Sequence, residues 1–119
     1  MITVSGLRNC DTCRKALAWL KELGIAHRFH DLRADGLDQA TVGHWAEAVG
    51  WEALLNRRGT TWRGLAEADR DGVDEARAMT LMVAHPALVK RPVFETGEDV
   101  LVGFDEAVRA RLASGPATP

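Results

Sequence analysis

Two cysteines, Cys10 and Cys13, are the residues of this sequence best suited to chemistry. They are the only cysteines in 119 residues, and two residues separate them. A pair this close cannot staple distant parts of a secreted fold, so we interpret it as a reactive site. The thiolate is the nucleophilic form of cysteine, and its use near neutral pH requires a pKa lowered from about 8.5. The predicted chemistry is therefore thiolate attack on an electrophile.

Cys10 lies where the sequence pattern changes from a strand to a helix. A short β-branched run at 1–5 ends at Gly6, which favours a buried strand and a turn. Beyond it, apolar residues recur at helical spacing, and Gly24 is suited to the helix C-terminus. These apolar positions are Cys13, Leu17, Leu20 and Leu23. Cys10 is thereby predicted at a helix N-terminus, where free N–H groups stabilise an anion.

Charged neighbours act on Cys10 in opposite directions. Arg8, Arg14 and Lys15 favour the thiolate, and Asp11 disfavours it. We expect the positive charges to prevail and Cys10 to be the nucleophile.

Cys13 allows two interpretations. One helical turn beyond Cys10, it could attack a mixed disulfide and act as a resolving thiol. It could equally be a small core residue, because free cysteine is often buried. A zinc site is disfavoured, since no second cysteine pair exists and His27 and His30 fall in a strand pattern. No metal is expected.

Two basic stretches could bind an anionic substrate. They are Asn-Arg-Arg-Gly-Thr-Thr-Trp-Arg at 56–63 and Lys-Arg-Pro at 90–92. Arginine holds anionic oxygens in a bidentate fork. Taken alone, each stretch is also compatible with solvated surface. Pro92 precedes a predicted strand, where proline marks a turn or a cis bond, and the isomer is open.

The order of predicted elements indicates one α/β domain at 1–113. Strand, helix and strand come first, helices fill a region at about 35–85, and two strands and a helix follow. Asp38 is a candidate N-cap, Pro86 is expected to begin an extended stretch, and the residues at 114–119 are expected to be disordered. An apolar stripe is predicted at Ala76, Met79 and Val83. This order predicts a thioredoxin-like fold, with a helical insertion between the βαβ and ββα halves of a mixed sheet of about four strands.

Composition restricts the partners. The net charge of −2 and the pI near 6.1 give no basic excess for direct binding to nucleic acid or an anionic membrane. No apolar run approaches the roughly 18 residues of a membrane helix, and no signal peptide pattern opens the chain. We therefore expect a cytoplasmic protein. The two basic stretches described above are suited to a small-molecule thiol or oxyanion substrate.

Four motifs together resemble the arsenate reductase-related family, and within it the Spx- and YffB-like members. They are Asn-Cys-Asp-Thr-Cys-Arg-Lys-Ala at 9–16, Leu-Asn-Arg-Arg-Gly-Thr-Thr-Trp-Arg at 55–63, His-Pro-Ala-Leu-Val-Lys-Arg-Pro at 85–92 and Val-Gly-Phe at 102–104. They occur in the family's order and cover nearly the whole chain. The resemblance is closest to the YffB-like members, through the Arg-Gly-Thr-Thr-Trp-Arg stretch.

This resemblance implies a thioredoxin fold with Cys10 as nucleophile. Matched motif by motif, it implies that Arg63 and Arg91 bind the anionic substrate and that Pro92 occupies the cis-proline position. It further implies a glutathione-dependent thiol/disulfide reductase with no bound cofactor, glutathione as co-substrate, and glutaredoxin or thioredoxin as a candidate partner. Many YffB-like members lack the second cysteine, so Cys13 leaves a dithiol mechanism open.

Two alternatives accompany that interpretation. Arsenate reductases use a third arginine shortly after the last strand, but no basic residue follows Val102 here until Arg109. Loss of such a charged hydrogen bond costs on the order of 1.5–3 kcal/mol, which disfavours arsenate. The other alternative is an Spx-like redox-sensing regulator that binds RNA polymerase through a surface controlled by the two cysteines.

Overall fold

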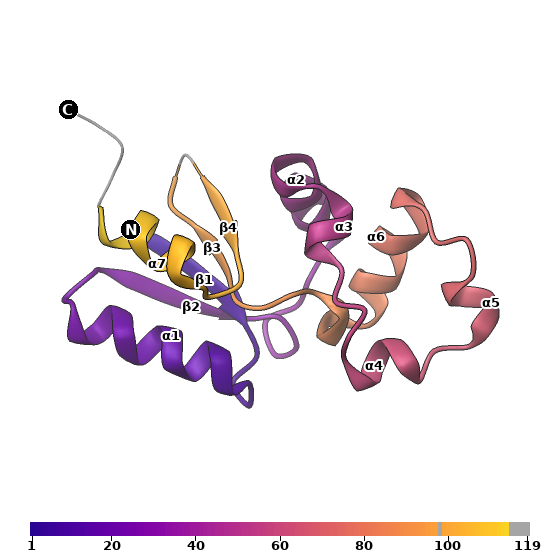
Figure 1. Cartoon of the computed structure of the whole chain (residues 1–119), viewed down its shortest axis with the longest axis horizontal. Helices are drawn as coiled ribbons and strands as arrows, with labels where there is room; N and C mark the ends of the chain where they lie inside the picture. The colour runs from indigo at the N-terminus through magenta and orange to yellow at the C-terminus, as the bar shows by residue number, and fades with distance from the viewer. Residues whose placement is uncertain (98, 115–119) are drawn as a thin grey trace. The chain divides into compact units, whose positions relative to one another are not determined.

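A computed structural model describes residues 1–97 and 99–114 (Figure 1). The chain divides into two compact units: Met1–Asp35 with the chain from Arg91 onward, and Gly36–Lys90. The second unit occupies the region of the predicted helical insertion. Of the tail predicted to be disordered, only Ser114 lies within the described residues. In the described part of the chain, no helix has the length and apolar character needed to cross a membrane.

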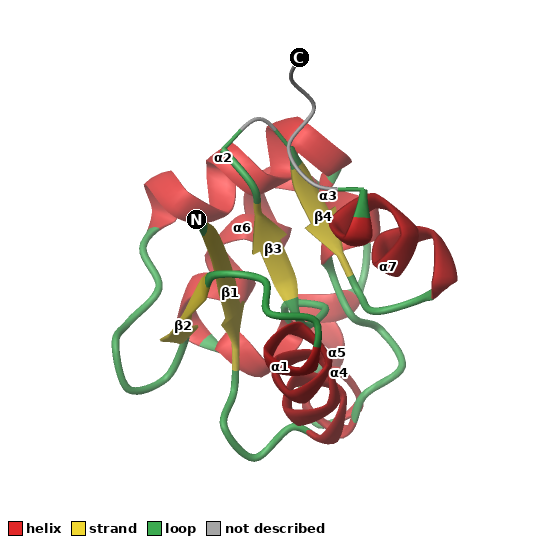
Figure 2. Ribbon diagram, turned by 90° about the vertical axis from the view of Figure 1, so that its left-hand side faces the viewer, coloured by secondary structure: helices red, strands yellow, loops and turns green. Residues whose placement is uncertain are grey.

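The first unit is built on a four-stranded mixed sheet. Its strands are β1 (Ile2–Gly6), β2 (His27–Asp31), β3 (Val93–Glu95) and β4 (Val100–Val102). They lie in the order β2-β1-β3-β4, as Figure 2 shows. β1 pairs in parallel with β2 and antiparallel with β3, and β3 and β4 form an antiparallel hairpin. This arrangement confirms the predicted fold class.

Two helices cover one face of this sheet. α1 (Asp11–Glu22) and α7 (Glu106–Ala113) are the helices of the first unit (Figure 2). Their buried side chains form one cluster with those of the central strands: Val4, Ala16, Leu20, Phe94, Val108 and Leu112. Leu23, which continues the apolar spacing of this helix, is not buried. α1 ends at Glu22, and Leu23 at its C-cap is 52% exposed. Ala16, in mid-helix, takes part in the core instead.

The second unit consists of short helices. They are α2 (Gln39–Val49), α3 (Trp51–Leu54), α4 (Thr60–Arg63), α5 (Glu67–Arg70), α6 (Glu75–Ala84) and the 3-10 helix η1 (Pro86–Leu88). α2 packs against α3 and α6. Asp38 is the N-cap of α2, as predicted, and its carboxylate accepts a hydrogen bond from the Thr41 N–H at 2.8 Å.

Two predictions for the second unit are wrong. The buried stripe of α6 is formed by Ala78, Leu81 and Met82, while Ala76 is exposed and Met79 and Val83 are only half-buried. Both sets of residues recur at spacings of three and four, so the sequence pattern did not distinguish them. Packing of α6 against neighbouring helices buries the face that carries Ala78, Leu81 and Met82. The stretch after His85 is not extended, because proline is well accommodated in the first turn of a helix and starts η1.

Candidate thiol site

Cys10 occupies the junction between β1 and α1. Its backbone is extended (φ −98°, ψ 121°), and its carbonyl accepts the first helical hydrogen bond, from the Arg14 N–H at 3.0 Å. The Cys10 N–H donates to the Leu7 carbonyl at 3.2 Å, which closes the preceding turn. The Cys10 side chain is half-exposed. Its sulfur is thus held at a helix N-terminus with access to substrate.

Cys13 lies on the buried side of the same helical turn. Cys13 is 1% exposed, and its sulfur lies close to Gly6 at the end of β1. A Cβ atom added at Gly6 would overlap the Cys13 sulfur, so the absence of a side chain at this position creates the space for the thiol. The sequence predicted only a turn at Gly6. It did not predict this role, because the approach of the helix to the strand is a tertiary contact.

The environments of the two thiols differ in their effect on pKa. Burial by itself would raise the pKa of Cys10, but hydrogen bonds from the Cys13 backbone N–H and the Arg91 guanidinium lower it below its ordinary value. Burial above all, together with the adjacent Cys10 sulfur, raises the pKa of Cys13 to about 11, although the Leu7 N–H and the Arg91 charge act to lower it. Cys10 is therefore the activated thiol of the pair.

Arg91 and Pro92 bring the start of β3 to Cys10. The Arg91–Pro92 peptide bond is cis. Pro92 is fully buried, and its carbonyl accepts a hydrogen bond from the Gly103 N–H at 2.9 Å. The half-buried Arg91 places its guanidinium within hydrogen-bonding reach of the Cys10 sulfur. Cys10, Cys13, Arg91 and Pro92 thus meet within the first unit.

The basic residues near Cys10 in the sequence have other partners. The Arg8 Nε lies 3.5 Å from the Asp31 carboxylate. Arg14 donates from Nε to the Arg8 carbonyl at 2.9 Å, and its Nη1 lies 3.6 Å from Asp11. These arginines organise the loop before Cys10, whereas Arg91, distant in sequence, is the arginine that acts on its sulfur.

Asp31, at the end of β2, supports this loop and was not singled out by sequence reasoning. Its Oδ1 accepts hydrogen bonds from the N–H groups of Arg33 (2.9 Å) and Ala34 (3.0 Å). The Ala34 N–H, together with the Arg33 N–H and Arg8, outweighs burial and lowers the pKa of Asp31. An aspartate that ends a strand and precedes a turn is the local signal that could have identified it.

Arg63 belongs to the second unit, where it is exposed at the end of α4. Its predicted role beside Cys10 stays a prediction. The loop before α4 makes several contacts within the second unit. The Arg57 guanidinium lies 5.5 Å from the Trp51 ring and 5.7 Å from the Trp62 ring. The Asn56 side chain accepts a hydrogen bond from the Arg58 N–H at 3.0 Å.

The described residues between β4 and Arg109 include no basic side chain. Asp105 is there instead, as the N-cap of α7, and accepts a hydrogen bond from the Val108 N–H at 2.9 Å. Arg109, the next basic residue, lies 4.7 Å from the Phe104 ring and donates to the Phe104 carbonyl at 3.3 Å. Its guanidinium is thus used in packing.

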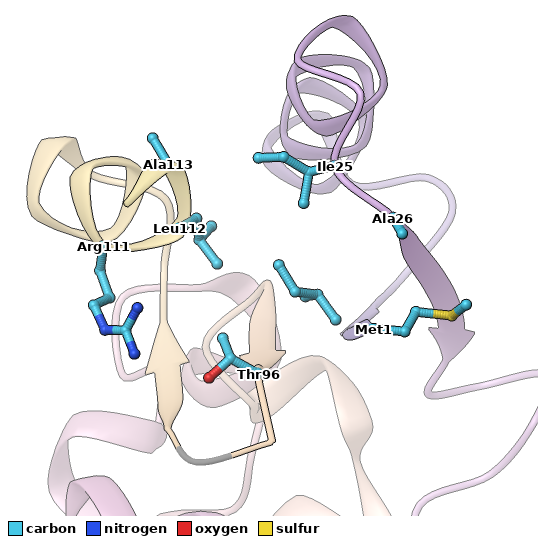
Figure 3. A pocket seen from close by; sticks show the side chains of 8 residues that line it. Met1, Ile25, Ala26, Thr96, Arg111, Leu112 and Ala113 are labelled. Carbon is cyan, nitrogen blue, oxygen red and sulfur yellow. The ribbon is translucent and has the colours of Figure 1, made fainter. Parts of the chain in front are cut away.

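Among residues 1–97 and 99–114, no group of three His, Cys, Asp or Glu side chains could hold a metal ion. A cavity of about 320 Å³ lies at the opposite end of β1 from Cys10, between Met1, Ile25 and Leu112 (Figure 3). Its lining is mainly apolar, and its Arg111 is paired with Asp99. It contributes no group to the thiol chemistry.

The helix-terminal thiol and the mixed sheet together define a thiol-based reductase fold of the thioredoxin-like class, related to arsenate reductases. A model of the ArsC family matches residues 6–111, and the chain belongs to this family.

Solved structures and curated relatives agree with this assignment. A YffB protein superposes with a TM-score of 0.89 at 43% identity, covering 93% of this chain and 97% of that one. An arsenate reductase (ArsC) related protein from Brucella melitensis superposes with a TM-score of 0.76 at 46% identity, covering 92% of both chains. The global transcriptional regulator Spx of Streptococcus agalactiae is 29% identical over 94% of this chain and 83% of its own.

Proposed function

We propose that this protein is a glutathione-dependent thiol/disulfide reductase with Cys10 as its nucleophile. The observation that carries the proposal is the asymmetry of the two thiols: Cys10 is half-exposed with a lowered pKa, and Cys13 is buried with a pKa raised to about 11. Burial disfavours the thiolate form of Cys13, which is the form that would have to attack a mixed disulfide at Cys10. Regeneration by an external thiol is therefore favoured over attack by Cys13.

The proposed reaction balances as two thiol–disulfide exchanges. The Cys10 thiolate attacks the glutathione sulfur of a mixed disulfide R–S–S–G, which forms a new disulfide bond between Cys10 and glutathione as the S–S bond of R–S–S–G breaks and RS⁻ leaves. The RS⁻ leaving group takes a proton from water. A second glutathione thiolate attacks the Cys10 adduct, releases oxidised glutathione and restores the Cys10 thiolate. Glutathione supplies both electrons, so the protein needs no bound cofactor.

In this mechanism, arginines hold the anionic part of the substrate. Arg91 has the direct support of its contact with the Cys10 sulfur, and Pro92 adjoins it. Arg63 is proposed as the second arginine from its place in the Thr-Thr-Trp-Arg motif. Glutaredoxin or thioredoxin is a candidate electron donor in place of glutathione. The cytoplasm is the proposed location, because a reduced thiol pool maintains the free Cys10 there.

Substitution of each cysteine tests the proposal. The assay is reduction of 2-hydroxyethyl disulfide by excess glutathione, followed as NADPH consumption by glutathione reductase. Cys10→Ser should abolish turnover, and Cys13→Ser should retain a measurable part of it. Complete loss in both variants would contradict the glutathione mechanism and favour a dithiol one.

The role of Arg63 has a matched control in the same loop. Arg63→Ala should raise KM for an anionic disulfide, while Arg58→Ala, at another exposed arginine, should leave KM unchanged. An equal increase in KM in the two variants would mean that Arg63 contributes only to the general surface charge and does not bind the substrate directly.

Arsenate reduction and redox-sensing regulation are the other candidates. The Brucella melitensis relative is described as arsenate reductase related, but here Asp105 stands where a third arginine would be needed. The similarity to Spx and the Cys10–Cys13 spacing support a regulator that binds RNA polymerase. Capture of the polymerase α-subunit in an oxidant-dependent manner would support that regulator, and glutathione-dependent turnover without capture would support the reductase.

A further inference from the structure

Arg57 connects two short helices of the second unit. It lies in the loop between α3 and α4 (Figure 1). Its guanidinium carbon is 5.5 Å from the centre of the Trp51 ring and 5.7 Å from the centre of the Trp62 ring. Both distances fall within the roughly 6 Å over which a cation and an aromatic face attract each other. Trp51 begins α3 and Trp62 belongs to α4, so one cation contacts an aromatic ring of each helix.

The α3 side of this contact is well anchored. α3 packs against both α2 and α6. The Asn56 N–H, just beyond α3, donates to the Leu88 carbonyl at 2.7 Å. The Lys90 N–H donates to the Leu54 carbonyl, also at 2.7 Å. Arg57 directly follows these paired segments, so its side chain extends from a fixed part of the backbone.

α4 depends more strongly on the contacts of its side chains. It is a single turn, Thr60–Arg63, which contacts η1, and none of its four residues is buried. A helix this short is not stable through backbone hydrogen bonds alone, so its position depends on packing. Trp62, which is half-buried, has the largest of the four side chains and offers most of the surface for such packing.

Arg63 directly follows Trp62 in the same helical turn. The Arg63 N–H donates to the Gly59 carbonyl at 3.3 Å, so the Arg63 backbone moves with the rest of α4. The Arg63 side chain is exposed at the end of this helix. The orientation of α4 therefore sets the direction in which the Arg63 guanidinium extends, and a contact that fixes Trp62 also fixes Arg63.

We propose that Arg57 is a positioning residue, which fixes α4 through the Trp62 ring and thereby orients Arg63 for an anionic substrate. This inference rests on the proposed function, in which Arg63 binds the anionic part of the substrate. Arg57 acts through Arg63 and does not itself contact the substrate. A purely stabilising residue would change the free energy of unfolding, whereas loss of this contact also changes the native state.

NMR relaxation of the full-length protein tests the positioning without any assay of activity. In Arg57→Ala, the backbone N–H order parameters of Thr60–Arg63 should fall from about 0.85, typical of rigid backbone, to below about 0.6. Those of Asn56 and Lys90, in the paired segments, should stay the same. Arg58→Ala, at the neighbouring exposed arginine, is the matched control and should change neither set. Unchanged order parameters at Thr60–Arg63 in Arg57→Ala would overturn the proposal.

Steady-state kinetics test the consequence for the substrate, with the mixed disulfide of glutathione and 2-mercaptoethanol as probe. Arg57→Ala should raise KM about fivefold, the size expected for loss of one exposed cation–π contact, and leave kcat unchanged. Arg57→Lys, which keeps the cation, should raise KM less. In an Arg63→Ala background, Arg57→Ala should have no further effect on KM, because it acts through Arg63. The same increase in that background, or in Arg58→Ala, would overturn the proposal.

The two experiments distinguish failure of this inference from failure of the proposed function. Absence of glutathione-dependent turnover in the unmodified protein, or an unchanged KM in Arg63→Ala, would contradict the proposed function and with it the substrate role of Arg57. Loss of order at Thr60–Arg63 in Arg57→Ala would still support the fixing of α4 by Arg57.

Discussion

Gly6 is predicted to be the position at which a single methyl group most directly disturbs the thiol site. In Gly6→Ala the new Cβ would overlap the Cys13 sulfur, which lies in a fully packed region between β1 and α1. Gly6 has no positive φ, so the expected effect is steric and not one of backbone strain. Overpacking of this kind costs about 1–3 kcal/mol in the free energy of unfolding. For a chain of this length, that corresponds to a decrease in Tm of roughly 4–12 °C.

The same geometry predicts that Cys13→Ala relieves the overlap. With the sulfur removed, the nearest atoms to the new Cβ are the Cys13 Cβ at 3.5 Å and the Phe29 Cε1 at 3.7 Å, both at ordinary contact distance. Cys13→Ala alone should cost about 1 kcal/mol from lost packing. The double variant should be no less stable than Cys13→Ala, which gives a coupling free energy of about 1–3 kcal/mol between the two sites.

Urea unfolding of the four proteins, in reductant to prevent disulfides, measures this coupling. The linear dependence of the free energy on urea gives each stability, and the m-value verifies that the same transition is observed. Additivity of the two single substitutions within about 0.5 kcal/mol would refute the inferred contact between Gly6 and the Cys13 sulfur.

Three further predictions concern charge. Arg91→Ala should raise the pKa of Cys10, because the variant lacks the hydrogen bond and the positive charge that Arg91 supplies to the Cys10 sulfur. The pH midpoint of Cys10 alkylation by iodoacetamide should therefore move upward, and Arg91→Lys should give an intermediate midpoint. An unchanged midpoint in Arg91→Ala would contradict the contact. Because the pKa of Asp31 is lowered on folding, its contribution to stability is present above the unfolded pKa near 3.9 and is lost as pH falls through the folded pKa. Asp31→Asn should therefore show a smaller loss of stability than the unmodified protein in urea unfolding between pH 6 and pH 3, and equal losses would contradict this. Arg57→Ala should destabilise the second unit by about 1–2 kcal/mol, because the Arg57 guanidinium lies near two indole rings. The same variant should shift tryptophan fluorescence to longer wavelength. If neither the stability nor the fluorescence changes, the guanidinium does not stack on the rings.

Much of the fold followed from local sequence signals. Three features could be predicted from neighbouring residues: the β-branched run at the start, the N-cap Asp38, and Gly24, which follows the C-cap of α1 with a positive φ. The four-stranded mixed sheet followed from the order of the elements. Errors arose where local patterns were degenerate: the buried face of α6 was misassigned because two sets of positions had equal helical spacing, and only contact with other helices distinguished them.

For the site, the sequence by itself determined the reactive residue type, its place at a helix N-terminus and the family motifs that single out Arg63, Arg91 and Pro92. The sequence also predicted Cys10 as the nucleophile, but only the tertiary structure shows which groups set the pKa of each thiol. The pKa of Cys10 depends on Arg91, some 80 residues away in sequence, and that of Cys13 depends on burial under Gly6. Desolvation and hydrogen bonding act between groups that lie within a few ångströms of each other in space. The pKa shifts that they cause therefore cannot be predicted from the order of residues along the chain.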